Sequence, residues 1–379
     1  MTARADGARS GSRPRVIVNA SGLRAGGGSA LVHAVLDELA EGGDRGLDWV
    51  FIVARQVIDE HESAHALPVR LVPQHRAPLR RIVWEQLALA RPAPGGAPEV
   101  LVSGGNFGPL ARREAHVLLA LNRLHFERPA VRARKGLRLR VESALARASV
   151  RRAGLTVTPS CDMARAVEAR TGRRSTVLAF GPGLVKRHVP APAGRFTFAL
   201  RTPWGPHKRL ADLLLAVREL ALTDAGRFVV VSSCDPGTRF ARRFRESERD
   251  RALLRDPLVS DHVRFETFGP ARQTTLECDA VVVPGTTESF SIPLAEATGV
   301  GVPVVAADTS FAREICGPSA FFVPPGDHRA LAGAMRRAIH GERPPPPPAD
   351  VRARLSWPAY VDGLAEICRA VAAGTAPPA

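Results

Sequence analysis

The 379-residue sequence has few cysteines and no long apolar run. Its cysteines are widely separated, so the sequence predicts neither a disulfide framework nor a zinc site and fits a reducing cytoplasm best. No stretch approaches the roughly 18 apolar residues needed to cross a bilayer, and residues 1–14 lack the apolar core of a signal peptide. We therefore expect a cytoplasmic protein, in which any contact with the inner membrane face is peripheral.

Acidic residues are also in short supply, with 37 Asp and Glu against 53 Lys and Arg, which leaves a net charge of +16. Such a charge attracts phosphates, nucleic acid or anionic lipid. The arginines are scattered rather than interleaved with aromatic residues, so a solvated basic surface is an equal alternative and no nucleic-acid partner is expected. The densest basic stretch, residues 128–152, is the candidate for docking on an anionic membrane.

What the sequence does contain is two series of short apolar runs separated by helical patterns, which predicts an α/β protein. The first series comprises residues 15–19, 49–53, 99–102, 117–121 and 155–158, with a helix starting at Ser29 as its N-cap. The second series comprises residues 196–200, 228–232, 263–267, 280–283, 302–306 and 320–323. Helices are expected at residues 209–220, 292–298 and 327–339, and an amphipathic helix at 360–373.

The domain organisation follows from chain length and from two proline-rich stretches. A chain of this length accommodates two domains of ordinary size. Residues 182–192 predict a linker, and the five prolines at 344–348 predict a stiff spacer. We therefore expect a disordered tail at 1–14, doubly wound domains at 15–188 and 189–349, and a final helix and tail at 350–379.

The strongest candidate for chemistry is a pair of glutamates, Glu288 and Glu296, which follow the expected strand at 280–283. Ligands bind at the carboxyl ends of strands in open α/β sheets. The helix that carries Glu296 would present its N-terminal amides to phosphate oxygens, and these belong to Phe290, Ser291 and Ile292. The structural alternative is that Glu288 caps the helix and Glu296 is exposed to solvent.

Three further groups are candidates. Arg201 and Lys208 follow the first strand of the second series, where two cations reach the same crevice. Gly27 and Gly28 lie in a glycine loop between the first strand and its helix, and this loop lacks the residues of a P-loop. His125 follows the fourth strand of the first series, although a lone histidine is more often structural.

The glutamate segment resembles the motif of family 4 (group 1) glycosyltransferases, whose usual pattern is E-G-F-G-L-P-x-x-E-A. Residues 301–307 also resemble the G-x-P-V-V-A strand of this family. Ser289 and Ser291 stand where the pattern has two glycines. The positions that match the pattern are Glu288, Phe290, Pro293, Glu296 and Ala297.

This resemblance implies the GT-B fold, in which two Rossmann-like domains face each other across a cleft and a C-terminal helix crosses back. It implies that Glu296 binds the nucleotide ribose and Glu288 the donor sugar. Arg201 and Lys208 would stabilise the leaving diphosphate. Gly27 and Gly28 would approach the donor phosphates, and His125 would contact the transferred sugar.

The function implied is transfer of a sugar from a nucleotide diphosphate sugar to a hydroxyl of a sugar, lipid-linked or small-molecule acceptor, in polysaccharide or glycoconjugate biosynthesis. Retention of configuration is implied by the family alone. No metal or other cofactor is expected, because Arg201, Lys208 and helix amides supply positive charge. A nucleotide-sugar epimerase and a noncatalytic basic binding protein are the alternatives.

Overall fold

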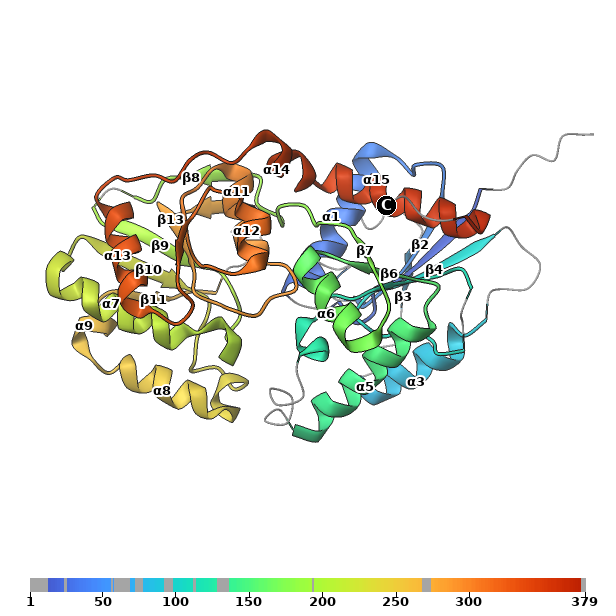
Figure 1. Ribbon diagram of the computed structural model, residues 1–379, viewed down its shortest axis with the longest axis horizontal. Helices are drawn as coiled ribbons and strands as arrows, with labels where there is room; N and C mark the ends of the chain where they lie inside the picture. Colours follow the sequence, from blue (N-terminus) through green and yellow to red (C-terminus); the bar gives the residue numbers. More distant parts are fainter. Residues whose placement is uncertain are drawn as a thin grey trace, which may run out of the picture.

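The computed structural model describes residues 13–23, 26–55, 57, 69–71, 78–91, 98–111, 114–127, 136–192, 194–267 and 274–375. Most of the tail expected at residues 1–14 and the first part of the basic stretch, residues 128–135, lie outside the described residues. The described residues form two α/β domains that lie side by side (Figure 1).

The N-terminal domain is built on a seven-stranded parallel sheet with the order β3-β2-β1-β4-β5-β6-β7. Its central strands are apolar and buried, as expected where helices cover both faces of a parallel sheet. The strands are β1 (Arg15–Asn19), β2 (Asp48–Val53), β3 (Val69–Leu71), β4 (Glu99–Ser103), β5 (His116–Leu119), β6 (Leu155–Thr158) and β7 (Thr176–Val177). The helices are α1 (Gly27–Gly42), α3 (Pro78–Ala88), the 3₁₀ turn η2 (Arg123–Phe126), α5 (Gly136–Arg152) and α6 (Cys161–Thr171).

The C-terminal domain repeats this plan with a six-stranded parallel sheet in the order β11-β10-β9-β13-β14-β15. Its strands are β9 (Phe196–Leu200), β10 (Phe228–Ser232), β11 (Val263–Phe265), β13 (Ala280–Val283), β14 (Val304–Ala307) and β15 (Phe321–Val323). Its helices are η3 (Pro206–Lys208), α7 (Leu210–Asp224), η4 (Ala241–Arg243), α8 (Arg245–Leu253), α9 (Pro257–Ser260), α11 (Ile292–Val300), α12 (Ser310–Cys316) and α13 (His328–Ile339). A separate pair of short strands, β8 (Arg187–Val189) and β12 (Thr275–Glu277), crosses the boundary expected at residue 188.

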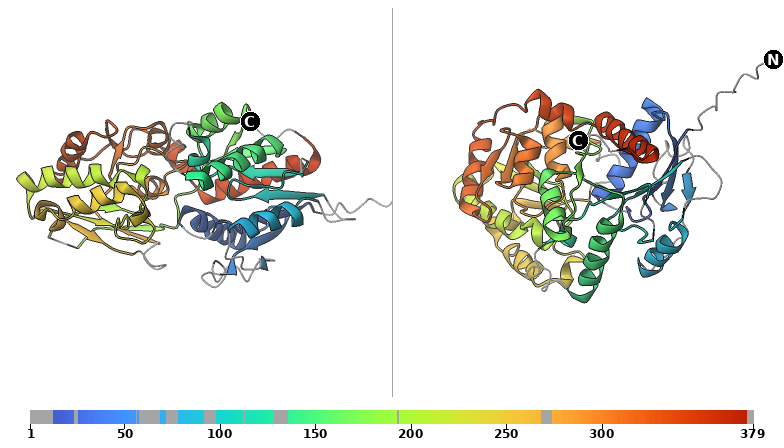
Figure 2. Two further views of the ribbon diagram at one scale, coloured as in Figure 1. Left: turned by 90° about the horizontal axis from the view of Figure 1, so that it is seen from below. Right: turned by 45° about the vertical axis from the view of Figure 1, so that its right-hand side comes forward.

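The last two helices, α14 (Ala349–Arg354) and α15 (Trp357–Ala373), return the chain to the N-terminal domain. The Ser356 hydroxyl caps α15 by accepting from the Ala359 amide at 3.3 Å. Helix α15 then packs against α1 and lies over β4 (Figures 1 and 2). The prediction of two doubly wound domains with a helix that crosses back is thus confirmed.

The main differences from the sequence-based expectations concern helix starts. Ser29 is not the N-cap of α1, because the helix already begins at Gly27 and Gly26 occupies the cap position with φ 61. The Ser29 hydroxyl instead donates to the Gly26 carbonyl at 3.0 Å. The pattern did not predict α6, although Ser160 is its N-cap and Gly172 its left-handed C-cap.

Candidate active site

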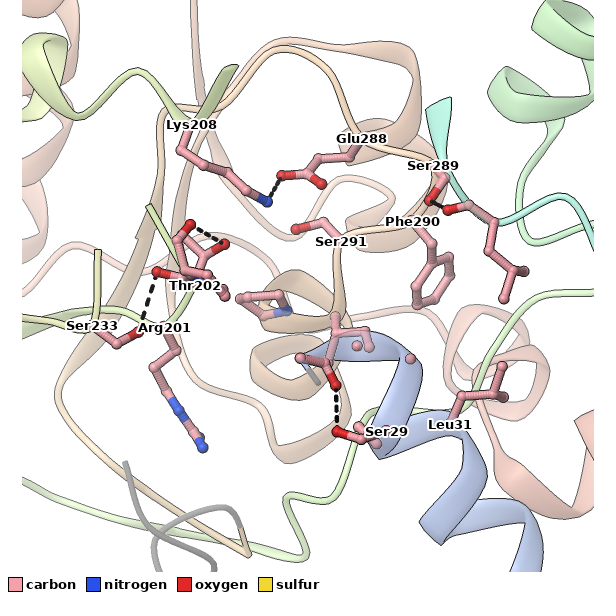
Figure 3. A pocket seen from close by; sticks show the side chains of 18 of the residues that line it. Ser29, Leu31, Arg201, Thr202, Lys208, Ser233, Glu288, Ser289, Phe290 and Ser291 are labelled. Atoms are coloured by element: carbon pink, nitrogen blue, oxygen red, sulfur yellow. Dashed lines mark hydrogen bonds and ion pairs between the residues drawn. The ribbon is translucent and has the colours of Figure 1, made fainter. Parts of the chain in front are cut away.

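A cavity of about 910 Å³ lies between the two domains and opens at the carboxyl ends of both sheets. The N-terminal domain contributes the start of α1 and the loops after β1, β4 and β5 to its wall. The C-terminal domain contributes the loop after β9 and the segment from Glu288 to Glu296 (Figure 3). Of the ten residues expected at the site, nine line this cavity, and these are Gly27, Gly28, Arg201, Lys208, Glu288, Phe290, Ser291, Ile292 and Glu296.

Two ion pairs join residues that were expected at the site, and the first is between Lys208 and Glu288. Lys208 ends the short turn η3, which follows β9, and its ammonium donates to a carboxylate oxygen of Glu288 (Figure 3). Both side chains are largely buried, with 16% and 13% exposed. The cation expected after β9 and the first glutamate of the motif therefore lie together. Both the positive and the negative charge of this pair are largely shielded from solvent.

The second ion pair joins Arg201, at the end of β9, to Glu296, in the second turn of α11. Arg201 Nη1 lies 3.6 Å from Glu296 Oε2, and each side chain is 9% exposed. Burial raises the pKa of the Glu296 carboxyl to about 7, although the Arg201 charge and a hydrogen bond from the Leu184 backbone act in the opposite direction. Glu296 is thus a buried acid that changes charge near neutral pH.

Gly183 supports the position of this carboxyl group. It adopts φ 64, and a Cβ atom built on it would lie 2.4 Å from Glu296 Oε1. The indole N–H of Trp357 donates to the Gly183 carbonyl at 2.6 Å. The start of α15 is therefore in direct contact with the backbone that packs on Glu296.

An aromatic cluster links α15 to the glutamate motif as well. The Phe180 ring lies 5.1 Å from Phe290, 5.4 Å from Tyr360 and 6.4 Å from Trp357, measured between ring centroids. Phe290 directly follows the loop that carries Glu288. Packing by the returning helix thus fixes the backbone between the two glutamates.

Two helix N-termini meet at the cavity, one from each domain. A Cβ atom on Gly27, the first residue of α1, would lie 2.8 Å from the Ile292 side chain, the first residue of α11. The first helical hydrogen bond of α11 runs from the Ala295 amide to the Ser291 carbonyl at 3.1 Å, so the earlier amides precede the helical ladder. Both positive helix ends suit an anionic ligand.

The structure does not bring His125 to this group. His125 is 4% exposed, and its Nδ1 lies 3.4 Å from the Ser143 hydroxyl while its ring packs on Phe107. Burial lowers the pKa of His125 to about 4, so the imidazole is neutral at pH 7. The 3₁₀ turn η2 directs it into the N-terminal domain, whereas Asn122 of the same segment lines the cavity.

Sequence reasoning missed Asn106, which shapes the N-terminal wall. It is 7% exposed with φ 75, and its side-chain oxygen accepts hydrogen bonds at 2.7 Å from the amides of Leu121 and Asn122. All three residues line the cavity. The sequence did contain a signal for this loop. The segment Gly104-Gly105-Asn106 directly follows a buried strand, and both glycine and asparagine tolerate a positive φ.

Within the described part of the chain, no three His, Cys, Asp or Glu residues are grouped so as to hold a metal ion. The expectation that no metal is needed stays a prediction. None of the described helices is both long enough and apolar enough to span a membrane.

Solved structures similar to this chain share the two-domain architecture. Sucrose-phosphate synthase from Thermosynechococcus elongatus aligns with a TM-score of 0.61 at 17% identity, over 96% of this chain and 97% of that one. Anabaena Alr3699/HepE, in complex with UDP and glucose, aligns with a TM-score of 0.60 at 17% identity, over 95% and 97%. A UDP-forming α,α-trehalose-phosphate synthase from Burkholderia vietnamiensis aligns with a TM-score of 0.58 at 13% identity, over 97% and 100%.

A search of curated protein sequences finds no match. Residues 204–356, however, match the family model described as glycosyl transferases group 1. This range contains Lys208 and the whole glutamate motif, which led to the same family from the sequence. The matched part of the C-terminal domain is therefore a group 1 glycosyltransferase domain, and the chain as a whole has the two-domain GT-B fold that it shares with these solved structures.

Proposed function

We propose that the protein transfers a sugar from a nucleotide diphosphate sugar to an acceptor hydroxyl at the cavity between its domains. The observation that carries this proposal is the convergence of two buried cation–carboxylate pairs and two helix N-termini on one cavity. Cations and helix amides suit a diphosphate, whereas carboxylates accept hydrogen bonds from sugar hydroxyls.

Each group has a proposed task in that reaction. Glu296 accepts from the ribose hydroxyls and Glu288 from the donor sugar. Arg201, Lys208 and the amides of residues 290–292 stabilise the charge that develops on the diphosphate as its bond to the sugar breaks. Gly27 and Gly28 allow the N-terminal domain to approach the phosphates closely.

In this reaction the bond between the anomeric carbon and the diphosphate oxygen breaks, and a bond to the acceptor oxygen forms. We propose that the acceptor proton passes to the departing phosphate on the same face, which retains the configuration. Glu288 is paired with Lys208 and is assigned to the sugar hydroxyls, not to attack. NMR assignment of the anomeric product tests retention, and unchanged turnover with a chelator tests the proposed independence from metal.

The similar structures favour a uridine nucleotide as the first probe. One is described in complex with UDP and glucose, and another is named as UDP-forming.

A thermal-shift panel of nucleoside diphosphates and their sugars tests the donor proposal, because a ligand that binds the folded state raises the melting temperature. We expect a selective shift that is lost in Glu296→Gln. No shift with any donor would contradict the proposal. Conversion of a nucleotide sugar to its epimer without an acceptor would favour the epimerase alternative.

We also propose peripheral contact with anionic lipid through α3 and α5, which lie on the same side of the N-terminal domain (Figures 1 and 2). Among the described side chains of these helices, four apolar ones face solvent: Val83 (56% exposed), Leu87 (76%), Leu137 (73%) and Val141 (56%). Exposed arginines, such as Arg140, accompany them. Apolar insertion combined with basic charge suits an anionic membrane surface and a lipid-linked acceptor.

A further inference from the structure

Ser289 connects the glutamate motif to the opposite domain through both its side chain and its backbone. Its hydroxyl, labelled in Figure 3, donates to the carbonyl of Leu121 in the loop that follows β5. Its own carbonyl accepts from the Ser160 hydroxyl at 2.6 Å. Ser289, which stands between Glu288 and Phe290, is thus bonded to the N-terminal domain both as a hydrogen-bond donor and as a hydrogen-bond acceptor.

Its two partners are held firmly by their own domain. The Leu121 amide donates to the buried Asn106 side chain at 2.7 Å, which fixes the peptide chain around the accepting carbonyl. The Ser160 hydroxyl also accepts from the Met163 amide at 3.1 Å as the N-cap of α6. Neither partner has to reorganise to meet Ser289.

Other polar contacts between the domains lie beside this one but outside the cavity. The Cys161 amide donates to both Glu314 oxygens at 2.9 and 3.0 Å, and the Ser310 hydroxyl donates to Asp162. These bonds join α6 to α12. Ser289 differs from them because it lines the cavity and is covalently adjacent to Glu288.

The hydroxyl is also where this chain departs from the motif it resembles, since a glycine there would keep the carbonyl but lose the donor. We propose that the Ser289 hydroxyl is a clasp that stabilises the closed arrangement of the two domains and so positions Glu288 and the following amides against the N-terminal wall. Ser289 is a positioning residue for sugar transfer. Its catalytic consequence rests on the proposed function, whereas its effect on closure does not.

The hydrogen bond from Ser289 shifts the equilibrium between the closed and the open arrangement of the two domains. The hydroxyl reaches Leu121 only when the domains are together, so this bond stabilises the closed state and contributes nothing to an open one. A typical net hydrogen bond changes such an equilibrium by roughly three- to tenfold. The other interdomain bonds remain in a Ser289 variant, so the fold itself should persist.

Small-angle X-ray scattering of the full chain without ligand tests the clasp directly. Ser289→Ala and Ser289→Gly are expected to increase the radius of gyration, whereas Ser289→Thr, which keeps the hydroxyl, is expected to match the wild type. Ser247→Ala is the matched control, because this buried hydroxyl donates to the Phe244 carbonyl at 2.9 Å within one domain. Wild-type scattering from Ser289→Ala and Ser289→Gly, or equal expansion of Ser247→Ala, overturns the proposal.

Turnover of a nucleotide sugar supplies the second readout. In Ser289→Ala, kcat is expected to fall roughly three- to tenfold while the Kd for UDP changes less than about twofold, because Arg201 and Glu296 are untouched. Unchanged kcat overturns the positioning role. If the wild type turns over no nucleotide sugar but Ser289→Ala still expands the molecule, the proposed function fails and the clasp stands.

Discussion

Arg201 and Glu296 face each other at 3.6 Å with only 9% of each side chain exposed, so the second glutamate of the motif is a buried acid beside a buried cation. Burial outweighs the attraction of the arginine and raises the pKa of Glu296 to about 7. Below that pH the group is a neutral acid, and above it a carboxylate that accepts two hydrogen bonds from a ribose diol. Nucleotide binding should therefore depend on pH through this residue.

We predict that nucleotide affinity rises by roughly tenfold between about pH 6 and pH 8, since the ionised fraction of a group with pKa near 7 grows by that factor. Glu296→Gln keeps the shape of the side chain but cannot ionise. This variant should bind the nucleotide more weakly, and its affinity should lack the rise that ionisation of Glu296 causes. Isothermal titration of UDP at several pH values measures both proteins. Parallel pH profiles for the two would rule out Glu296 as the titrating group.

Lys208→Ala is predicted to lower kcat by about 10²- to 10³-fold, because a preorganised cation stabilises the departing diphosphate more than the bound donor. The affinity for UDP should fall less, since Arg201 and the helix amides remain. Lys186→Ala is the matched control, because Lys186 is exposed and does not line the cavity. Equal kcat values for the two alanine variants would contradict the role of Lys208.

The motif residues were predictable because they are close in sequence and stand at strand ends. Residues 288–296 follow β13, and Arg201 and Lys208 follow β9, which is its neighbour in the sheet. Parallel neighbours end at the same edge, so these loops had to meet. The two α/β series likewise determined the fold class.

The missed features depend on contacts between distant parts of the chain. Ser289 meets Ser160 across 129 positions, and Gly183 meets Trp357 across 174. No local pattern encodes such pairs. The orientation of His125 also follows from tertiary packing, because Phe107 and Ser143 lie on other elements.

Gly183→Ala is predicted to weaken UDP binding at least about tenfold, because an added Cβ would displace the Glu296 carboxyl and the backbone conformation disfavours a side chain. Gly226→Ala provides the control for conformational strain alone. Gly226 has φ 79, but nothing lies within 4 Å of its added Cβ. Calorimetry should show weaker binding only for Gly183→Ala, and equal losses would assign the effect to strain rather than to Glu296.

Gly27→Val is predicted to reduce kcat roughly tenfold by overpacking the contact between the two helix starts. The added atoms would meet the end of the Ile292 side chain, which can shift, so Gly27→Ala should have a smaller effect. Steady-state kinetics measure both variants. Combining Gly27→Val with Ile292→Ala should recover part of the lost rate, and failure of this rescue would show that the defect arises within α1.

The exposed apolar and basic surface of α3 and α5 predicts sedimentation with phosphatidylglycerol vesicles at low salt and release at high salt, because salt screens the arginines. Leu137 and Val141 are one helical turn apart on the same face of α5, so Leu137→Glu with Val141→Glu should abolish sedimentation by opposing both insertion and charge attraction. Leu222→Glu is the matched control, because Leu222 is 65% exposed on α7 of the other domain. Sedimentation of the double variant at the wild-type level would exclude this surface, whereas loss of binding in Leu222→Glu would show that total charge, not location, governs the contact.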